Sequence, residues 1–256
     1  MCGRYTLQTK RVDLARELGL SEDDLLELPP RWNVAPSQPV PIVRRRTGPG
    51  GAVREMLQVV WGLVPEWAND PRIGNRLINA RMESLVEKPA FRDSFRERRC
   101  LVPADGFYEW APLHGDGPRL PHYIRLASRR PFTFAGLWSR WRDPAGVPVE
   151  SCTIVTRPPN EAIGRLHDRM PAILPPESRE AWLDPSVRDA ATLLELLGPL
   201  PPELFEIFPV GRHVNSPDHD DPSCIEPWSG REEPRESPPA ARRRPSGGTL
   251  DLFGGS

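Results

Sequence analysis

The chain has 256 residues, of which 38% are hydrophobic and 33 are proline. Average proline usage is about 5%, so this content argues against a coiled coil or a long helical bundle and favours short elements joined by turns. The formal net charge of −1 excludes a protein-wide basic field, so any nucleic-acid contact must come from a local patch. No run approaches the roughly 20 apolar residues of a membrane span. We therefore expect a cytoplasmic protein with reduced thiols and no membrane contact.

Helical periodicity is clearest near the start of the chain. Apolar residues at helical spacing predict a helix over Thr9–Leu18, and Gly19 is a typical stop signal. Ser21, followed by a run of acids, predicts a second N-cap. Two later helices are predicted over Glu177–Leu183 and Ser186–Leu197.

Runs of β-branched and aromatic residues predict the strands that follow the first helix. These strands are Val40–Arg44, Met56–Trp61, His122–Leu126, Phe132–Trp138, Cys152–Thr156 and Leu204–Val210. Strands clustered between helical ends favour an α+β fold with mainly antiparallel pairing. After Trp228 the composition changes to Pro, Ser, Gly, Arg and Glu, so residues 229–256 are predicted to be a disordered tail on a single domain, residues 1–228.

Cys2 follows the initiator methionine, which is normally trimmed when the next residue is small. Trimming would leave an α-amine and a thiol on adjacent carbons, with reference pKa values of about 8 and 8.5 that keep part of each group nucleophilic near neutrality. The amine can condense with an aldehyde to an imine, and the thiolate can then close a thiazolidine ring. The alternative interpretation is an incidental cysteine at a frayed terminus.

Three further residues offer acid–base or polar chemistry. Glu109 lies between two aromatic residues, which would desolvate the carboxyl and raise its pKa toward general acid–base use. The alternative is a strand whose acid faces solvent. His167 is a proton carrier suited to neutral pH, or a structural histidine. Asn79 stands with Arg81 and Glu83 in a motif that, alone, is only a polar turn or strand end.

Taken together and in order, the motifs resemble the SRAP family, the SOS response-associated peptidase-like proteins that shield abasic sites in DNA. The resemblance runs from Met1 to about Trp228. It implies a compact α+β domain with a barrel-like arrangement of antiparallel strands, short peripheral helices, and neither a metal nor an organic cofactor. The motifs are Met1-Cys-Gly-Arg-Tyr5, Trp32-Asn-Val-Ala-Pro36, Trp61-Gly-Leu-Val-Pro65, Asn79-Ala-Arg-Met-Glu83, Gly106-Phe-Tyr-Glu-Trp110 and His167-Asp-Arg-Met-Pro171.

The resemblance implies a reaction with single-stranded DNA. An abasic site opens to an aldehyde, which Cys2 would capture as a thiazolidine, forming a covalent DNA–protein crosslink in the DNA damage response. Glu109 would move protons during sugar-ring opening and imine formation. His167 would assist ring opening and hold a sugar hydroxyl, and Asn79 would hydrogen-bond the new ring or the amine.

The same resemblance implies a set of DNA contacts. Arg4 and Arg81 would hold flanking phosphates through charge-assisted hydrogen bonds. Trp67 would stack on, or wedge beside, a base next to the lesion. Thr156 stands at a strand end near the site. Bound to DNA, the protein would be associated with the nucleoid.

Two other classes of function stay open at this point. One is a thiol peptidase, acting on itself or on other proteins, with Cys2 as nucleophile and His167 as base. The other is a non-catalytic single-strand binding module, whose salt-sensitive binding would ignore abasic sites. Structural zinc has little support, because none of the four cysteines forms a C-x-x-C pair.

The tail contains one apolar cluster, Leu250-Asp-Leu-Phe253. It resembles the core of peptides that bind the bacterial sliding clamp, although Thr249 stands where glutamine is usual. Leu250, Leu252 and Phe253 would fill an apolar cleft, with weak affinity because a flexible segment must be ordered on binding. An unselected terminus is the alternative.

Overall fold

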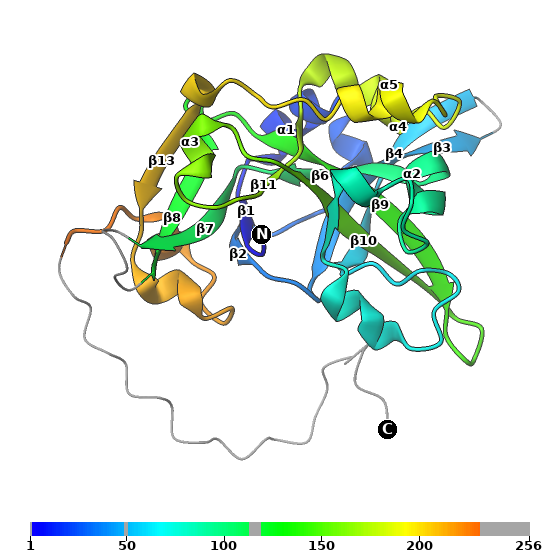
Figure 1. Ribbon diagram of the computed structural model, residues 1–256, viewed down its shortest axis with the longest axis horizontal. Coiled ribbons are helices and arrows are strands. Elements are labelled where there is room, and N and C mark those ends of the chain that lie inside the picture. Colours follow the sequence, from blue (N-terminus) through cyan, green and yellow to red (C-terminus); the bar gives the residue numbers. More distant parts are fainter. Residues whose placement is uncertain (1, 49–50, 113–118, 231–256) are drawn as a thin grey trace.

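The computed structural model describes residues 2–48, 51–112 and 119–230 (Figure 1). Most of the predicted tail, with the apolar cluster at residues 250–253, lies outside the described residues. Near the end of the described chain, the Trp228 N–H donates a hydrogen bond of 2.9 Å to the Pro209 carbonyl. This contact ties residue 228 to the folded domain.

One sheet has five antiparallel strands, in the order β13-β8-β7-β1-β2. The shortest of these strands, β1, is internal and pairs with β2 on one side and β7 on the other. The segment that begins the described chain is therefore held within a sheet. The strands are β1 (Tyr5–Leu7), β2 (Arg31–Val34), β7 (Gly106–Pro112), β8 (Arg119–Leu126) and β13 (Phe205–Pro209).

The second sheet closes on itself. Its strands run in the order β11-β10-β4-β3-β6-β9-β12, and β9 pairs again with β10, so that β10, β4, β3, β6 and β9 form a closed barrel. Strands β4 and β5 run parallel to β10, and the other pairings are antiparallel. The barrel-like α+β prediction is confirmed. The strands are β3 (Pro39–Gly48), β4 (Gly51–Trp61), β5 (Asn79–Arg81), β6 (Arg99–Ala104), β9 (Phe132–Arg142), β10 (Pro148–Arg157), β11 (Met170–Pro171) and β12 (Ile173–Leu174).

Short helices surround the two sheets (Figure 1). The first buries Leu14 and Leu18 and ends at Gly19, which adopts the left-handed conformation (φ 62°) that lets its N–H bond back to the helix. No described helix has the length and apolar character to cross a membrane. The helices are α1 (Arg11–Leu18), α2 (Arg92–Glu97), α3 (Glu161–Gly164), α4 (Arg179–Leu183) and α5 (Ala190–Glu195).

All the predicted strands are present, and several predicted boundaries differ from the structure. The predicted helix Thr9–Leu18 begins at Arg11, and the first residues of the predicted helix Glu177–Leu183 belong to a 3-10 turn that precedes α4. The predicted helix Ser186–Leu197 shortens to α5, because Asp189 caps its start by accepting a hydrogen bond from Thr192 N–H. Strand β13 begins one residue late, because Leu204 ends a 3-10 turn that starts at Pro202.

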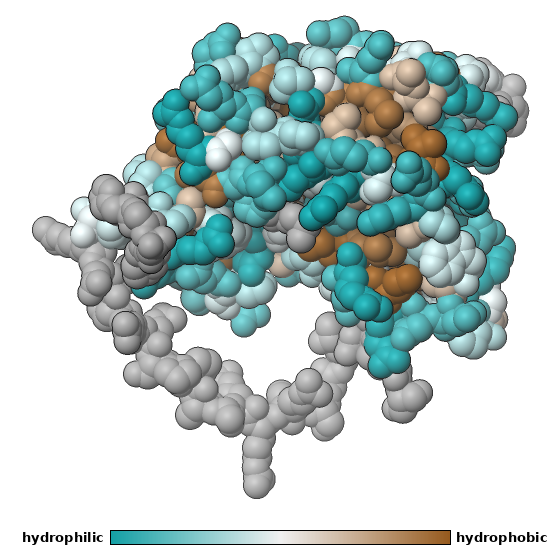
Figure 2. Space-filling model, viewed as in Figure 1, coloured by the Kyte–Doolittle hydropathy of each residue, from teal (hydrophilic) through white to brown (hydrophobic). Residues whose placement is uncertain are grey.

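Tyr5 joins the two sheets. Its fully buried ring packs against Trp61 and Phe134 of the barrel, with ring centroids 5.4 and 5.9 Å away. Hydrophilic residues cover most of the face in Figure 2, and the apolar side chains visible there form separate areas. The large core lies between and inside the sheets, so burial of Tyr5 fixes where the chain just before it must lie.

Candidate functional site

Cys2 is placed by the pairing of β1 with β7. Tyr5 lies opposite Phe107 in this antiparallel pair, and continuing the register places Gly3 opposite Glu109. The Cys2 thiol is fully buried, and burial together with the charge of Glu109 raises its pKa. The sulfur and the carboxyl therefore belong to one electrostatic environment.

Asn79 holds the same segment from the barrel side. Its side-chain amide donates a hydrogen bond of 2.8 Å to the Cys2 carbonyl. Asn79 begins β5, which lies parallel to β10 with Asn79 opposite Ile154. Its Oδ1 is buried and has no hydrogen-bond partner among the described residues. One polar atom of Asn79 thus positions Cys2, and the other can accept from a substrate.

Glu109 is only 2% exposed. Burial raises its pKa to about 7, against the positive charge of the amino terminus, which lowers it. Near neutrality the carboxyl is therefore present in both protonation states, as a group that gives and then takes a proton must be.

His167 lies between α3 and β11. Its Nδ1 accepts a hydrogen bond of 3.0 Å from the Arg169 N–H and also lies 2.8 Å from a carboxylate oxygen of Asp168. Burial lowers the pKa of His167, and the amino terminus, Asp168 and Arg119 act on its pKa as they act on that of Glu109. The charges of the amino terminus, Asp168 and Arg119 therefore act on both groups.

The predicted DNA contacts Arg81, Thr156 and Trp67 differ from one another in burial. Arg81 is exposed on β5, opposite Thr156 of β10. Thr156 is buried, and its hydroxyl has no hydrogen-bond partner among the described residues. Trp67 is 55% exposed and lines a surface hollow of about 560 Å³ together with the amides of Asn69 and Asn75. Arg81 and Thr156 lie on the same pair of strands as Asn79. The exposed Trp67 ring is available for stacking.

Arg4 is directed into the protein. Its guanidinium donates to Asn33 Oδ1 at 2.8 Å and to the carbonyls of Val214 and Asn215 at 2.8 and 3.2 Å. These bonds fasten the C-terminal part of the domain to β1 and β2. The partners of the Arg4 guanidinium therefore lie within the protein, as expected for a structural residue.

Glu83 and Arg169 lie within two of the sequence motifs but have no predicted role. The Arg169 guanidinium forms a two-pronged ion pair with Glu83, with nitrogen–oxygen distances of 2.7 and 2.9 Å. It also donates a hydrogen bond of 2.7 Å to the Thr156 carbonyl. The only signal in the sequence was one charged residue in each of two separate motifs.

One group of side chains in the described part of the chain has the composition of a metal site. Ligand atoms of His213, Asp221 and Cys224 lie within 4.8 Å of one another. His213 Nε2 and Asp221 Oδ2 are 2.9 Å apart, Asp221 Oδ1 accepts from Ser223 N–H, and the Cys224 thiol donates to the His219 carbonyl. These hydrogen bonds account for the arrangement without an ion.

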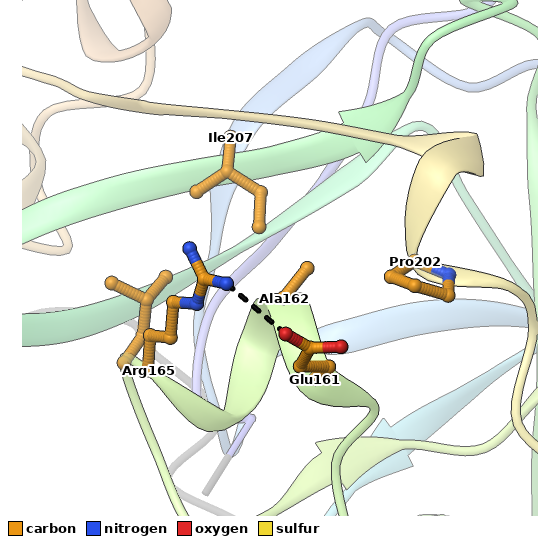
Figure 3. Close-up of a pocket in the computed structure, with 6 residues that line it drawn as sticks. Glu161, Ala162, Arg165, Pro202 and Ile207 are labelled. Atoms are coloured by element: carbon orange, nitrogen blue, oxygen red, sulfur yellow. Dashed lines mark hydrogen bonds and ion pairs between the residues drawn. The ribbon is translucent and has the colours of Figure 1, made fainter.

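A separate pocket of about 410 Å³ lies beside α3 (Figure 3). The close-up shows Glu161 and Arg165 joined by an exposed ion pair of 3.2 Å. None of the residues that line the pocket is a predicted site residue. They are Glu161, Ala162, Arg165, Leu166, Pro202 and Ile207.

The chain is similar to several known proteins. Residues 1–217 match the family model of the SOS response associated peptidase (SRAP). The abasic site processing protein YoqW of Bacillus subtilis is 41% identical over 229 residues, 88% of this chain and 99% of the relative. The abasic site processing protein HMCES of Rattus norvegicus is 28% identical, over 89% of this chain and 76% of the relative.

A crystal structure of a Bacteroides thetaiotaomicron protein is also similar. It has a TM-score of 0.77 and 28% identity, and the match covers 89% of this chain and 100% of that one. The family model spans the barrel, β1 with its preceding cysteine, and the segments that carry Asn79, Glu109 and His167. The chain therefore belongs to the SRAP family.

Proposed function

We propose that this protein processes abasic sites in single-stranded DNA by forming a covalent crosslink through Cys2. Relatives named abasic site processing proteins support the lesion as substrate. The observation that carries the proposal is the position of Cys2, whose carbonyl is bound by Asn79 and whose thiol lies in the field of Glu109. Removal of Met1, whether by this chain or by another enzyme, precedes the reaction.

The chemistry needs one group that serves in turn as acid and base. The freed Cys2 amine adds to the sugar aldehyde, and the carbinolamine then loses water when Glu109 protonates the leaving hydroxyl. The Glu109 carboxylate next takes the thiol proton as sulfur adds to the iminium carbon. The products are a thiazolidine and one water, and Glu109 regains its starting proton. A pKa of about 7 allows both transfers near neutrality.

His167 and Asn79 have supporting parts in this scheme. Because His167 Nδ1 accepts from the Arg169 N–H, the neutral imidazole carries its proton on Nε2. From that nitrogen, His167 would donate to an oxygen of the opened sugar. Asn79 Oδ1, buried and without a described partner, would accept from the amine or the new ring N–H.

DNA would lie over the exposed end of β5. Arg81, which is exposed, would bind a phosphate next to the lesion through its guanidinium. Trp67 would stack on a neighbouring base. The buried hydroxyl of Thr156, on the adjacent strand β10, would also bind the substrate.

The electrostatics support a thiol peptidase less well. Such an enzyme needs a thiolate, usually paired with an imidazolium. Here burial and Glu109 raise the pKa of the Cys2 thiol, while burial lowers the pKa of His167. Both shifts favour the neutral groups.

Intact mass measurement tests the proposal. Purified protein is incubated with an abasic single strand or with the intact strand. We expect an adduct only with the abasic strand, at the combined mass of protein without Met1 and DNA, less one water. Cys2→Ser should give no heat-stable adduct, and the control Cys224→Ser should react like wild type. A full yield of adduct from Cys2→Ser would refute the role of the thiol.

A further inference from the structure

The Arg169 guanidinium connects three segments that are far apart in sequence. It forms the two-pronged pair with Glu83, just after β5, and donates a hydrogen bond to the Thr156 carbonyl at the end of β10. The Arg169 side chain is 11% exposed, and that of Glu83 is 51% exposed. The pair is thus a partly buried clamp rather than a surface salt bridge, which typically contributes little.

The position of this clamp relates it to the site. Strand β10 lies between β5 and β11, with Thr156 opposite Arg81 on one side and opposite Pro171 on the other. The clamp therefore fixes β5, β10 and the loop before β11 relative to one another. These segments carry Asn79, Thr156 and His167.

His167 Nδ1 has two competing neighbours. The Arg169 N–H can only donate to it, which requires an unprotonated Nδ1 and places the proton on Nε2. The Asp168 carboxylate, 2.8 Å away, can only accept, which favours a proton on Nδ1. The location of the Arg169 backbone decides between them, and the Glu83 pair holds that residue in place.

We infer that Glu83 and Arg169 are positioning residues for the crosslinking reaction: they hold the His167 loop against β5 and β10 and keep the neutral imidazole protonated on Nε2. This inference rests on the proposed function for its role in the reaction, but the tautomer of His167 can be measured without DNA. A purely structural ion pair would contribute to folding and leave the tautomer unchanged.

The first experiment is ¹⁵N NMR of the histidine ring nitrogens in the DNA-free, full-length protein. In wild type we expect neutral His167 to be protonated on Nε2. In Glu83→Gln and in Arg169→Lys, which lacks the planar fork, we expect a shift toward the Nδ1–H form as Asp168 competes. The double variant Glu83→Gln/Asp168→Ala should return to Nε2–H, because the competing acceptor is gone.

The second experiment measures the single-turnover rate of crosslinking to an abasic strand. Glu83→Gln should be slower by at least about tenfold, since a misplacement of about 1 Å can cost 10²-fold. Its binding to intact strands should not weaken. Glu83→Asp should recover part of the rate. The control is Glu161→Gln, which breaks the exposed Glu161–Arg165 pair of Figure 3 and should react like wild type.

The two measurements separate the failure of this inference from failure of the proposed function. If wild type forms no crosslink, the proposed function fails, and the NMR result still tests the pair. If the two folded single variants, verified by circular dichroism, keep the wild-type His167 tautomer, the inference is overturned whatever their rates. A shifted tautomer that Asp168→Ala reverses supports it.

Discussion

The side-chain amide of Asn79 donates a hydrogen bond of 2.8 Å to the backbone carbonyl of Cys2. This bond joins the segment that precedes β1 to β5, which pairs with the barrel, at the place where the proposed reaction occurs. The reacting amine and thiol both belong to Cys2, so a residue that orients its carbonyl also restricts the direction of both nucleophiles.

We expect Asn79→Ala to slow crosslinking by about fivefold, because a hydrogen bond is worth about 1 kcal/mol and about 1.4 kcal/mol is a factor of ten in rate. Binding to intact single strands should stay within twofold of wild type. The rate is read from the appearance of the shifted band on denaturing gels. Gln58→Ala, which removes an exposed amide on β4, is the control. A wild-type rate for Asn79→Ala would remove Asn79 from the proposed reaction.

Replacing Glu109 should affect proton transfer more than binding. Glu109→Gln keeps the shape of the side chain and loses the proton, so both crosslinking and its reversal should slow by about 10²-fold or more. Affinity for intact strands should be unchanged in a fluorescence anisotropy titration. A variant that reacts at the wild-type rate but binds weakly would reassign Glu109 to DNA binding.

The raised pKa of Glu109 also predicts how stability depends on pH. Burial disfavours the charged carboxyl, so between the reference value of 4.5 and the folded value of about 7 the folded state holds more protons than the unfolded state. Stability is therefore lost as pH rises through this window. Glu109→Gln should be more stable than wild type by about 3 kcal/mol at about pH 8 and similar to wild type below about pH 4, by denaturant titration. Equal stability at both pH values would contradict the shift.

Arg81 and Arg4 were both predicted to bind phosphates, but we now expect their alanine variants to have different effects. Arg81→Ala should flatten the salt dependence of single-strand binding by roughly 0.7 in the log–log slope. Arg4→Ala should leave the slope unchanged and lower the free energy of unfolding by about 1.5–3 kcal/mol, because its donors bind Asn33 and the carbonyls of Val214 and Asn215. A flattened slope in Arg4→Ala, without loss of stability, would restore it to the DNA contacts.

The sliding-clamp contact remains a sequence prediction, since its residues lie outside those described. A peptide of residues 240–256 should bind purified bacterial clamp in the micromolar range, as expected when a flexible segment is ordered on binding. Phe253→Ala should abolish that binding. Absence of binding by the wild-type peptide at high concentration would exclude the motif and leave the Cys2 chemistry unaffected.

The elements that were predictable from sequence have strong local signals. Strand β9 is buried along most of its length and includes the buried aromatic residues Phe132, Phe134 and Trp141. Gly19 ends α1 in the left-handed backbone region that favours glycine. Strands β1 and β2 have only three and four residues, and their stability comes from pairing with partners far along the chain.

The site was less predictable because its geometry is set at long range. Glu109 was expected to be desolvated by its aromatic neighbours, Tyr108 and Trp110. Side chains alternate along a strand, and the rings of these neighbours contact each other, 6.3 Å apart, on the face opposite the carboxyl. Glu83 and Arg169 are separated by 86 positions, so no local pattern could pair them.

Because β1 is internal to its sheet, the number of residues between Cys2 and Tyr5 determines where Cys2 lies. Tyr5 is fixed by its ring contacts, and the Tyr108 N–H donates a hydrogen bond of 3.0 Å to the Arg4 carbonyl, which extends the pairing toward Cys2. One residue inserted between Gly3 and Arg4 would displace Cys2 by about 3.3 Å and turn its side chain to the other face. Such a protein would fold normally, but Cys2 would be displaced by one residue along the strand. The proposed reaction therefore depends on the spacing between Cys2 and Tyr5 as much as on the identity of Cys2.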